Sequence, residues 1–459
     1  MSNTVVFSFL LIMSLFLLAG AYAATRKRST TEDYLLASRS VSPWLTALSA
    51  AATSNSGYMF IGLIGFTYSV GISAMWLMVG WIGGDYLAWR FIHEKVRRRS
   101  QEEGWLTIPS FLGEGLGARG RWVVRASAFI TLLFLSFYAA AQLKAGSKAL
   151  HVLFGWDEVV GIVIGALIVG LYCLFGGIRA SIWTDAMQSV VMLGSMSVLL
   201  FVAMSQTGGF SGLWSSLAAI DPQLTNPIPP NLKFGFAIYL VSWITAGIGV
   251  CGQPHVMVRA MAIDKPEHIG LARRVYVVWY SLFSAAAIAV GLASRVLLSS
   301  SSEFDAELAL PLLSSELLPP VLVAFVLAGL FASTMSTADS QILSCSAALT
   351  QDLFPRWRQS YTMAKLGTVL MTAIVLVIAV AGSGSVFFLV VLAWSALAST
   401  LGPLLVVRAF RWPVDTWTAL GMILAGLGVC SAGATDSAYP TPFTKCSPEW
   451  PVDLVSTYS

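Results

Sequence analysis

The sequence predicts an all-α polytopic membrane protein with about twelve transmembrane helices. Of its 459 residues, 56% are hydrophobic and 11% are charged, whereas a soluble domain carries about 25% charged residues. Apolar segments of about 20 residues, the length that crosses a bilayer as a helix, recur along the whole chain. They lie near residues 4–24, 45–69, 72–92, 123–148, 158–176, 185–205, 234–254, 271–296, 318–346, 363–382, 385–407 and 416–435.

The first segment, 4–24, could be mistaken for a secretory signal because it ends in small residues, Ala21 to Ala24. No positive charge precedes it, and Arg26, Lys27 and Arg28 follow it directly. A signal peptide has the opposite polarity. We therefore interpret the segment as a retained helix with its N-terminus outside the cell.

The basic residues predict the topology. When the loop after the first helix is placed in the cytoplasm, alternation puts 22 of the 27 Lys and Arg residues on the cytoplasmic side. This asymmetry is the positive-inside pattern of a cell-membrane protein, with both termini outside. It also explains the net charge of +4 without a nucleic-acid partner.

The second segment contains a weak point for a helix. Its middle, Thr53 to Gly57, reads Thr-Ser-Asn-Ser-Gly; Ser and Asn side chains compete for backbone hydrogen bonds, and Gly adds backbone freedom. Unwinding here would expose backbone carbonyls and helix ends to an ion and a solute. The alternative is a face of small residues that packs against another helix.

A second weak point lies in segment 234–254, where Gly247, Gly249 and Gly252 precede Pro254. Two interrupted helices that each begin a five-helix half indicate a five-plus-five inverted-repeat transporter core, in which the first and sixth core helices are broken. The expected parts are an extra helix with a cytoplasmic loop (1–44), the core (45–410, with repeats near 45–205 and 234–407), and an extra helix with a polar tail (411–459).

The segment 318–346 ends in a polar run, Phe331 to Ser346, that reads FASTMSTADSQILSCS. Hydrocarbon cannot hydrogen-bond these groups, and a carboxylate there costs about 2.5–3.5 kcal/mol. Hydroxyls, carbonyls and a carboxylate form the hard-oxygen environment that binds alkali or alkaline-earth cations. Small polar residues can also simply join helices, but Asp339 and Gln341 at the same depth favour a site.

Three acidic residues fall inside apolar segments: Asp85, Asp185 and Asp339. We expect Asp85 and Asp185 near cytoplasmic helix ends, where water reaches them, and Asp339 deeper. His255, beside Arg259, is expected to be a structural hydrogen-bonding residue. The chain has no phosphate-binding glycine loop with Lys, no nucleophile elbow and no metal spacing among its five cysteines, which excludes the common enzyme and ATP-driven classes.

Five short motifs in order resemble the sodium/solute symporter family, and most closely its bacterial sodium/proline permeases, from about Glu32 to Arg411. They are Asp33-Tyr34-Leu35-Leu36 with Arg39-Ser40, Ser56-Gly57-Tyr58 with Gly62-Leu63, Gly176-Gly177 with Trp183-Thr184-Asp185 and Gln188, Gly252-Gln253-Pro254-His255 with Arg259, and Ser333 to Thr337. The resemblance implies the same inverted-repeat fold with extra helices at its ends.

The resemblance also implies the site residues. A Na⁺ ion, the coupling ion, would lie between the first and eighth core helices, held by the carbonyls of Ala52, Asn55 and Ser333 and the hydroxyls of Ser336 and Thr337. Asp185 would serve the inward ion pathway, to which we add Asp339. The expected substrate-binding residues, from the family cavity and the broken helices, are Ser54, Ser56, Gly57, Tyr58, Tyr138, Trp243, Gln253 and Pro254.

Three departures from the proline permeases stand out. Those proteins carry an Asp where this chain has Ser54, so Asp339 is the candidate replacement for that charge. A cavity Trp of the permeases falls on Ala246, one turn after Trp243. A last apolar helix is missing, because the Pro-rich polar tail 439–459 cannot span a bilayer.

The expected function is therefore secondary active transport, not enzymatic catalysis: symport of Na⁺ with a small organic solute, proline first, by alternating access and as a monomer. One alternative keeps the fold and couples transport to protons through Asp339. The other is a transporter-like membrane sensor.

Overall fold

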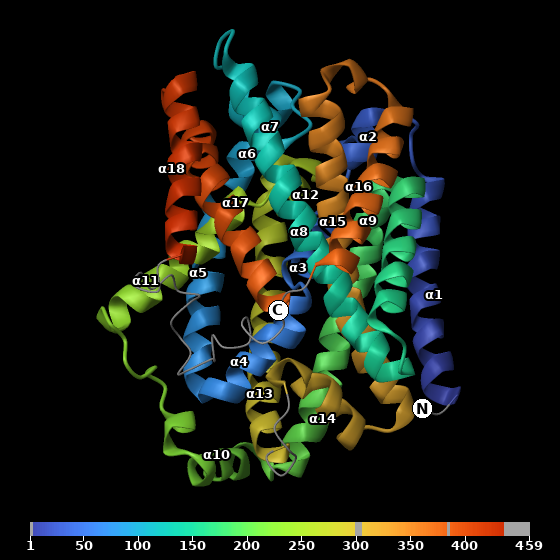
Figure 1. Ribbon diagram of the computed structural model, residues 1–459, viewed down its shortest axis with the longest axis vertical. Coiled ribbons are helices and arrows are strands. Elements are labelled where there is room, and N and C mark those ends of the chain that lie inside the picture. Colours follow the sequence, from blue (N-terminus) through green and yellow to red (C-terminus); the bar gives the residue numbers. More distant parts are fainter. Residues whose placement is uncertain (1–2, 299–304, 383–385, 436–459) are drawn as a thin grey trace.

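The computed structural model describes residues 3–298, 305–382 and 386–435, and these residues form a bundle of helices (Figure 1). The prediction of an all-α membrane protein is confirmed, since the described part contains no strand beyond an isolated bridge between Val41 and Ile263. Nine helices in the described part are long and apolar enough to cross a membrane. Each of the twelve predicted segments contains helix in the described part; the number is smaller because two pairs merge and the last, near 416–431, is short.

The first half of the chain contains two long helices, α8 and α9, and several short ones. Its elements are α1 (Asn3–Thr25), α2 (Thr31–Leu36), η1 (Ala37–Arg39), α3 (Pro43–Ser54), η2 (Tyr58–Gly62), α4 (Leu63–Val70), η3 (Gly71–Ala74), α5 (Met75–Phe91), α6 (His93–Glu102), α7 (Ile108–Gly113), α8 (Gly120–Phe154), α9 (Glu158–Gln206), α10 (Gly209–Ile220) and η4 (Pro222–Thr225).

The second half repeats the alternation of long and broken helices. Its elements are α11 (Gly235–Ile248), η5 (Gly249–Gly252), α12 (Pro254–Ala262), η6 (Pro266–His268), α13 (Ile269–Leu297), η7 (Ala306–Leu308), α14 (Ala309–Leu317), α15 (Pro320–Ala347), η8 (Ala348–Leu353), η9 (Pro355–Trp357), α16 (Tyr361–Ala381), α17 (Val386–Ala409) and α18 (Thr416–Thr435). The predicted polar tail lies outside the described residues.

Both predicted interruptions are present. Helix α3 starts at an N-cap, where Ser42 accepts a hydrogen bond from the backbone N–H of Leu45, and it ends at Ser54. The chain continues through Asn55 and Ser56 into the π-helical turn η2 and then α4. Asn55 closes the first half-helix, because its N–H donates to the carbonyls of Ala51 and Ala52.

In the second interruption, α11 tightens into the 3₁₀ turn η5, and Gln253 adopts an extended conformation (φ −99°, ψ 96°) before α12 begins at Pro254. The proline has no N–H to donate, so it starts the new helix without leaving an unsatisfied donor. The glycine-rich sequence therefore produces two half-helices with a non-helical joint.

Helix α9 contains two predicted spans joined at Gly177. Gly177 has φ 56° and ψ −149°, a region that favours glycine. A Cβ atom at this position would lie 2.5 Å from the carbonyl oxygen of Tyr34. The break lets α2 pack closely against the α9 backbone. It also explains why the predicted spans 158–176 and 185–205 form one helix that changes direction at Gly177.

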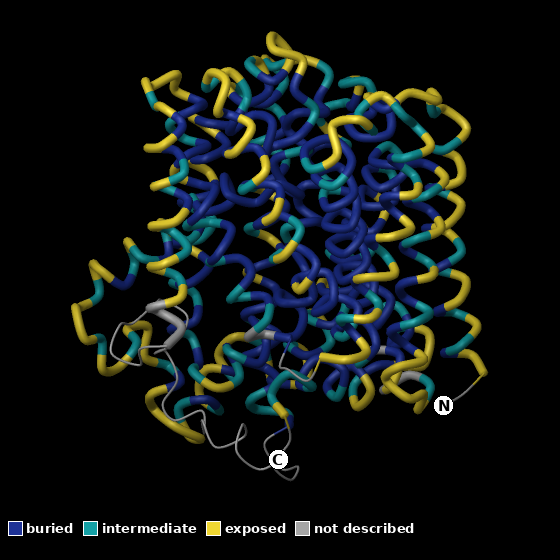
Figure 2. The backbone as a smooth tube through the Cα atoms, turned by 45° about the horizontal axis from the view of Figure 1, so that its top comes forward, coloured by how far each residue is buried: buried dark blue, intermediate teal, exposed yellow. Residues whose placement is uncertain are grey.

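Helix α15 forms the centre of the bundle and packs against α9, α8, α1, α3 and α16. In its most apolar window 83% of the residues are buried, against 28% for α1. Figure 2 shows this buried interior surrounded by outer helices with exposed residues. Because nothing in lipid can satisfy the polar run of α15, this central position explains how the fold tolerates it.

Candidate functional site

The interrupted helix α3 and the central helix α15 meet through oxygen atoms. The Ser336 hydroxyl lies 3.1 Å from the Ala52 carbonyl oxygen and 3.1 Å from that of Ser333. The Thr337 hydroxyl lies 3.0 Å from the carbonyls of Thr53 and Ser333. All five residues are buried. We call this group (Ala52, Thr53, Ser333, Ser336, Thr337) the oxygen junction.

The oxygen junction fits an alkali cation by its donor chemistry. It offers two hydroxyls and three carbonyls, all neutral hard-oxygen ligands. The helix ends here, so its last carbonyls can bond to a neighbour: the Gly57 N–H, four residues after Thr53, donates to Gln142, and the Ala52 carbonyl, which accepts the Asn55 N–H, has a second lone pair. A cation would require only that the hydroxyl protons turn away. No group of three or more His, Cys, Asp or Glu suited to a metal occurs among the described residues.

The structure brings four of the five residues expected to hold Na⁺ into this group. Asn55 lies beside them, because its N–H donates to the Ala52 carbonyl over 3.2 Å. Sequence reasoning missed the Thr53 carbonyl, although the free carbonyls at the end of a predicted half-helix were a signal for it.

A second group of buried residues lies one turn along α15. Asp185 on α9 accepts hydrogen bonds from Ser49 over 2.7 Å and from Arg259 over 3.2 Å. Arg259 is 1% exposed and Asp185 is 0% exposed, so this is a fully buried ion pair. We call Asp185, Arg259, Asp339 and Ser340 the charged cluster.

Ser340 links the charged cluster to the oxygen junction. Its hydroxyl lies 2.7 Å from Asp339 Oδ1, 2.6 Å from the Ser336 carbonyl and 3.2 Å from the Thr53 hydroxyl, and it accepts a hydrogen bond from Arg259. The Arg259 guanidinium therefore pairs directly with the Asp185 carboxylate and is linked to the Asp339 carboxylate through the Ser340 hydroxyl. Asp185 Oδ1 and Asp339 Oδ2 have no hydrogen-bond partner among the described residues.

Three expectations about polar residues are wrong. Asp185 and Asp85 do not reach water at helix ends; both are buried, because neighbouring helices cover them on every side. The His255 ring makes no hydrogen bond within the described residues. It packs edge-on against Tyr138, with 5.7 Å between ring centroids, and only its carbonyl is used, by Arg259.

A cavity of about 20 Å³ lies beside the interruption of α3. Four expected substrate residues line it: Ser54, Ser56, Tyr58 and Tyr138. Sequence reasoning missed the other walls, which come from α5, α13 and α17. The remaining lining residues are Met59, Leu77, Met78, Trp81, Tyr280, Val390, Val391 and Trp394. Trp81 and Trp394 are in contact, with ring centroids 4.8 Å apart, and none of the lining side chains is charged.

The other expected substrate residues lie outside this cavity. The Gly57 N–H donates to Gln142 over 2.9 Å. Trp243 packs its Cβ atom against Gly80 of α5. The side-chain amide of Gln253 donates to the Trp394 carbonyl over 3.0 Å, so it supports a cavity wall without facing the cavity.

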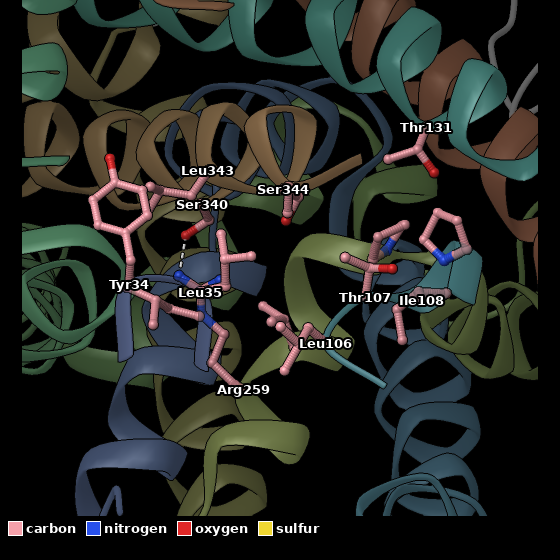
Figure 3. Close-up of a pocket in the computed structure, with 15 residues that line it drawn as sticks. Tyr34, Leu35, Leu106, Thr107, Ile108, Thr131, Arg259, Ser340, Leu343 and Ser344 are labelled. Carbon is pink, nitrogen blue, oxygen red and sulfur yellow. Dashed lines mark hydrogen bonds between the residues drawn. The ribbon is translucent and has the colours of Figure 1, made fainter. Parts of the chain in front are cut away.

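Pro254 lines a second cavity, of about 20 Å³, next to the charged cluster. Figure 3 shows Arg259 and Ser340 at one side of this cavity, with Leu106, Thr107 and Ile108 across from them. These three residues lie at the start of α7, on the end of the molecule that carries α2 and α6 (Figure 1). The cavity thus lies between the charged cluster and the start of α7.

The helix α2 is fixed to α9 by Asp33. The Asp33 carboxylate accepts hydrogen bonds from Arg179 over 2.5 Å, from Ser38 over 2.7 Å and from the Arg28 N–H over 2.7 Å. Burial raises the pKa of Asp33, but these hydrogen bonds outweigh it and hold the pKa below its usual value. This attachment holds Tyr34 against the second cavity.

The comparisons with known proteins agree with this geometry. The family model described as the sodium:solute symporter family matches residues 34–426. The high-affinity proline transporter PutP of Bacillus subtilis is 30% identical over 432 residues, covering 91% of this chain and 90% of that protein. A sodium/proline symporter of Staphylococcus aureus is 32% identical over 420 residues, covering 88% and 81%.

Two solved structures share the fold. A Na⁺-coupled sialic acid symporter in a substrate-bound outward-open state superposes with a TM-score of 0.74 at 19% identity, covering 94% of this chain and 98% of that one. A nucleobase-cation-symport-1 family transporter superposes with a TM-score of 0.57 at 17% identity, covering 90% and 97%.

Proposed function

The chain belongs to the sodium:solute symporter family, and from this premise we propose that it carries a small organic solute, proline first, together with Na⁺ by alternating access. The observation that supports this most is the position of the oxygen junction. Two of its three carbonyls, those of Ala52 and Thr53, come from the half-helix whose interruption also lines the solute cavity. Ion and solute would therefore act on the same joint.

For the ion, we propose that Na⁺ is held by the carbonyls of Ala52, Asn55 and Ser333 and the hydroxyls of Ser336 and Thr337, with the Thr53 carbonyl within reach. Na⁺ at this place would join α3 to α15 and fix the end of the interrupted helix. Moving one Na⁺ through a membrane potential of 100 mV supplies about 2.3 kcal/mol, which corresponds to about fortyfold accumulation of the solute.

For the solute, the uncharged cavity favours a small zwitterion over an anion or a large polar molecule. Its aromatic faces, Trp81 and Trp394 above all, can attract a cationic nitrogen, while the hydroxyls of Ser54 and Ser56 and the half-helix end can meet a carboxylate. Tyr58 and Tyr138 supply further hydroxyls. The names of the bacterial relatives make proline the first solute to test.

For release, we propose that Na⁺ leaves past Asp185 and Asp339 through the cavity beside Arg259 and Ser340. The unpaired oxygens of the two carboxylates can attract the cation on its way.

The basic residues support an orientation in which this cavity faces the cytoplasm and both termini lie outside. The proposed division is an N-terminal part (1–44), a two-repeat core (45–410) and a C-terminal part (411–459), acting as a monomer in the cell membrane.

Purified protein in liposomes tests the proposal. An inward Na⁺ gradient should drive labelled proline uptake above its equilibrium level, and an equal K⁺ gradient should not. A panel of other amino acids, betaines and sugars should compete less well than proline. Absence of Na⁺-driven uptake of every solute in the panel would refute Na⁺ symport.

The unpaired oxygen of Asp339 favours protons as the second candidate for the coupling ion. In that case a pH gradient in Na⁺-free medium should drive uptake, and replacing Asp339 with Asn should abolish it. Uptake that requires Na⁺ at every pH would exclude this alternative.

A further inference from the structure

One buried carboxylate takes no part in the proposed ion or solute sites. Asp85 lies on α5 and is 1% exposed. The Tyr276 hydroxyl of α13 donates a hydrogen bond to Asp85 Oδ2. Asp85 Oδ1 has no hydrogen-bond partner among the described residues. Within the same residues, no ion pair of 4 Å or less includes Asp85.

The neighbouring helices do not supply a compensating cation. Helix α5 packs against η3, α6, α11, η5 and α13. Helix α13 contributes two neutral hydroxyls, Tyr276 as the hydrogen-bond donor to Asp85 and Tyr280 stacked on it, and the turn η5 contributes a buried thiol, Cys251. Two arginines precede Tyr276 on α13: Arg273 places its guanidinium over the Tyr86 ring, 5.2 Å from the centroid, and Arg274 is exposed.

The remaining elements add no ion pair to Asp85. Helix α11 faces it with Gly247, where a Cβ atom would lie 3.0 Å from the Asp85 backbone nitrogen, and its titratable side chain, Tyr239, lies two turns away. The turn η3 has no titratable residue. On α6, His93 is buried and stacks on Trp89, with ring centroids 4.3 Å apart. Arg90 on α5 lies over the Phe91 ring.

Asp85 is nevertheless connected to the solute cavity. Tyr276 stacks on Tyr280, with centroids 5.4 Å apart and an angle of 19° between the rings. Tyr280 lines the cavity. One tyrosine side chain, Tyr276, thus separates the carboxyl group from the cavity wall.

A buried carboxylate without a cation costs several kcal/mol, so burial favours the protonated form. A positive charge in the uncharged cavity would act in the opposite direction and favour the ionised form. We propose that Asp85 binds a proton when the cavity is empty and releases it when the cationic nitrogen of a solute enters. On release the O–H bond of the carboxyl group breaks, the proton passes to bulk water, and Tyr276 continues to donate to the carboxylate.

This inference rests on the proposed function in one respect, the entry of a solute with a cationic nitrogen. Since binding is reciprocal, protons and solute compete. Solute affinity should therefore rise with pH across the titration of Asp85, by at most about tenfold per pH unit, the limit for one proton. Asp85→Asn should remove this dependence because the amide neither gains nor loses a proton.

Infrared difference spectroscopy on the purified full-length protein tests the proposal directly. The wild type should show a protonated-carboxyl band that Asp85→Asn lacks, and adding proline with Na⁺ should diminish this band. Tyr276→Phe should keep the band and shift it, because the hydrogen bond is lost. Asp415→Asn, at an exposed position, should match the wild type.

Proline binding, measured by calorimetry in the same samples, distinguishes a failure of the Asp85 inference from a failure of the proposed function. Identical bands in wild type and Asp85→Asn would overturn the inference, and so would a band that stays constant while proline binds. Failure of the wild type to bind proline in Na⁺ would instead refute the proposed function. The comparison of wild type with Asp85→Asn would then still decide whether Asp85 holds a proton.

Discussion

The oxygen junction and the charged cluster lie one turn apart on α15, but they are stabilised by different means. Every group in the oxygen junction is neutral, and each hydroxyl bonds to a carbonyl of its own helix and to one of α3. In the charged cluster, one buried arginine pairs with Asp185 directly and reaches Asp339 through the Ser340 hydroxyl. Both clusters are fully buried, so charge is the main difference between them.

This difference indicates which cluster can exchange an ion. The oxygen junction can accept a cation and lose it again while only hydroxyl protons reorient. The charged cluster cannot lose its arginine without leaving buried carboxylates uncompensated, which is strongly unfavourable. We therefore assign reversible Na⁺ binding to the oxygen junction and structural support, together with guidance of the leaving ion, to the charged cluster.

The largest expected effect comes from removing the cation of the charged cluster. Arg259→Ala should destabilise the protein by about 3–5 kcal/mol, because the buried Asp185 and Asp339 are left without a cation. Thermal unfolding in detergent measures this. Arg259→Lys, which keeps the charge but not the several hydrogen bonds, should lose less. An unchanged melting temperature in Arg259→Ala would contradict the comparison.

Substitutions in the oxygen junction should lower Na⁺ affinity and should hardly change the free energy of unfolding. Thr337→Val keeps the side-chain volume but removes one hydroxyl ligand, so the Na⁺ concentration for half-maximal uptake should rise at least about tenfold, equal to about 1.4 kcal/mol. Uptake measured against Na⁺ concentration gives this value.

Thr350 provides the matched control, since it is equally buried on the continuation of α15 and its hydroxyl bonds to the Ser346 carbonyl over 2.8 Å. Thr350→Val should keep the wild-type Na⁺ dependence. Equal shifts in the two valine variants would mean that the hydroxyls of this helix serve packing alone.

Substitutions in the solute cavity should lower proline affinity independently of the ion site. Trp394→Leu removes an aromatic face and should raise the proline concentration for half-maximal uptake about five- to thirtyfold, equal to about 1–2 kcal/mol. Competition binding at saturating Na⁺ measures this change. Trp417→Leu, at a residue that is 63% exposed, is the control and should leave proline affinity unaltered.

The last effect concerns a carboxylate outside both clusters. The folded protein lowers the pKa of Asp33, so the ionised carboxylate stabilises the fold at neutral pH. This stabilisation is lost as the pH falls from about 4, the usual value, through the lower folded value. Asp33→Asn should lower stability by about 1–2 kcal/mol at pH 7 and should flatten the acid dependence of the melting temperature.

Glu32→Gln provides the control for this effect, because its side chain is 52% exposed and lies 3.6 Å from Arg39. It should leave the acid dependence of the wild type intact. If Asp33→Asn retained the full acid dependence, another carboxylate would be responsible for it.

Local signals in the sequence were sufficient to predict the fold. Apolar length gave the spans, and the runs at Thr53–Gly57 and Gly247–Pro254 gave both interruptions, because helix breaking depends on the residues at the break. The oxygen junction was also predictable, since the hydroxyls of Ser336 and Thr337 cannot face lipid and have to meet an oxygen-rich partner.

Tertiary packing explains what the sequence did not reveal. Asp185 and Asp85 were placed near water because their position along a helix says nothing about which helices cover them. The Asp185–Arg259 pair joins residues 74 positions apart in the chain. The walls Trp81, Tyr280 and Trp394 come from three separate helices, and in sequence each resembles an ordinary apolar residue of a membrane span.

Equilibrium binding of radioactive Na⁺ to the purified protein, with and without saturating proline, tests the ion assignment most directly. In the wild type, proline should raise Na⁺ affinity by the same factor by which Na⁺ raises proline affinity. In the double variant Ser336→Ala, Thr337→Val, Na⁺ affinity should fall at least about tenfold with the melting temperature nearly unchanged. Wild-type Na⁺ affinity in that variant would contradict a Na⁺ site at the oxygen junction.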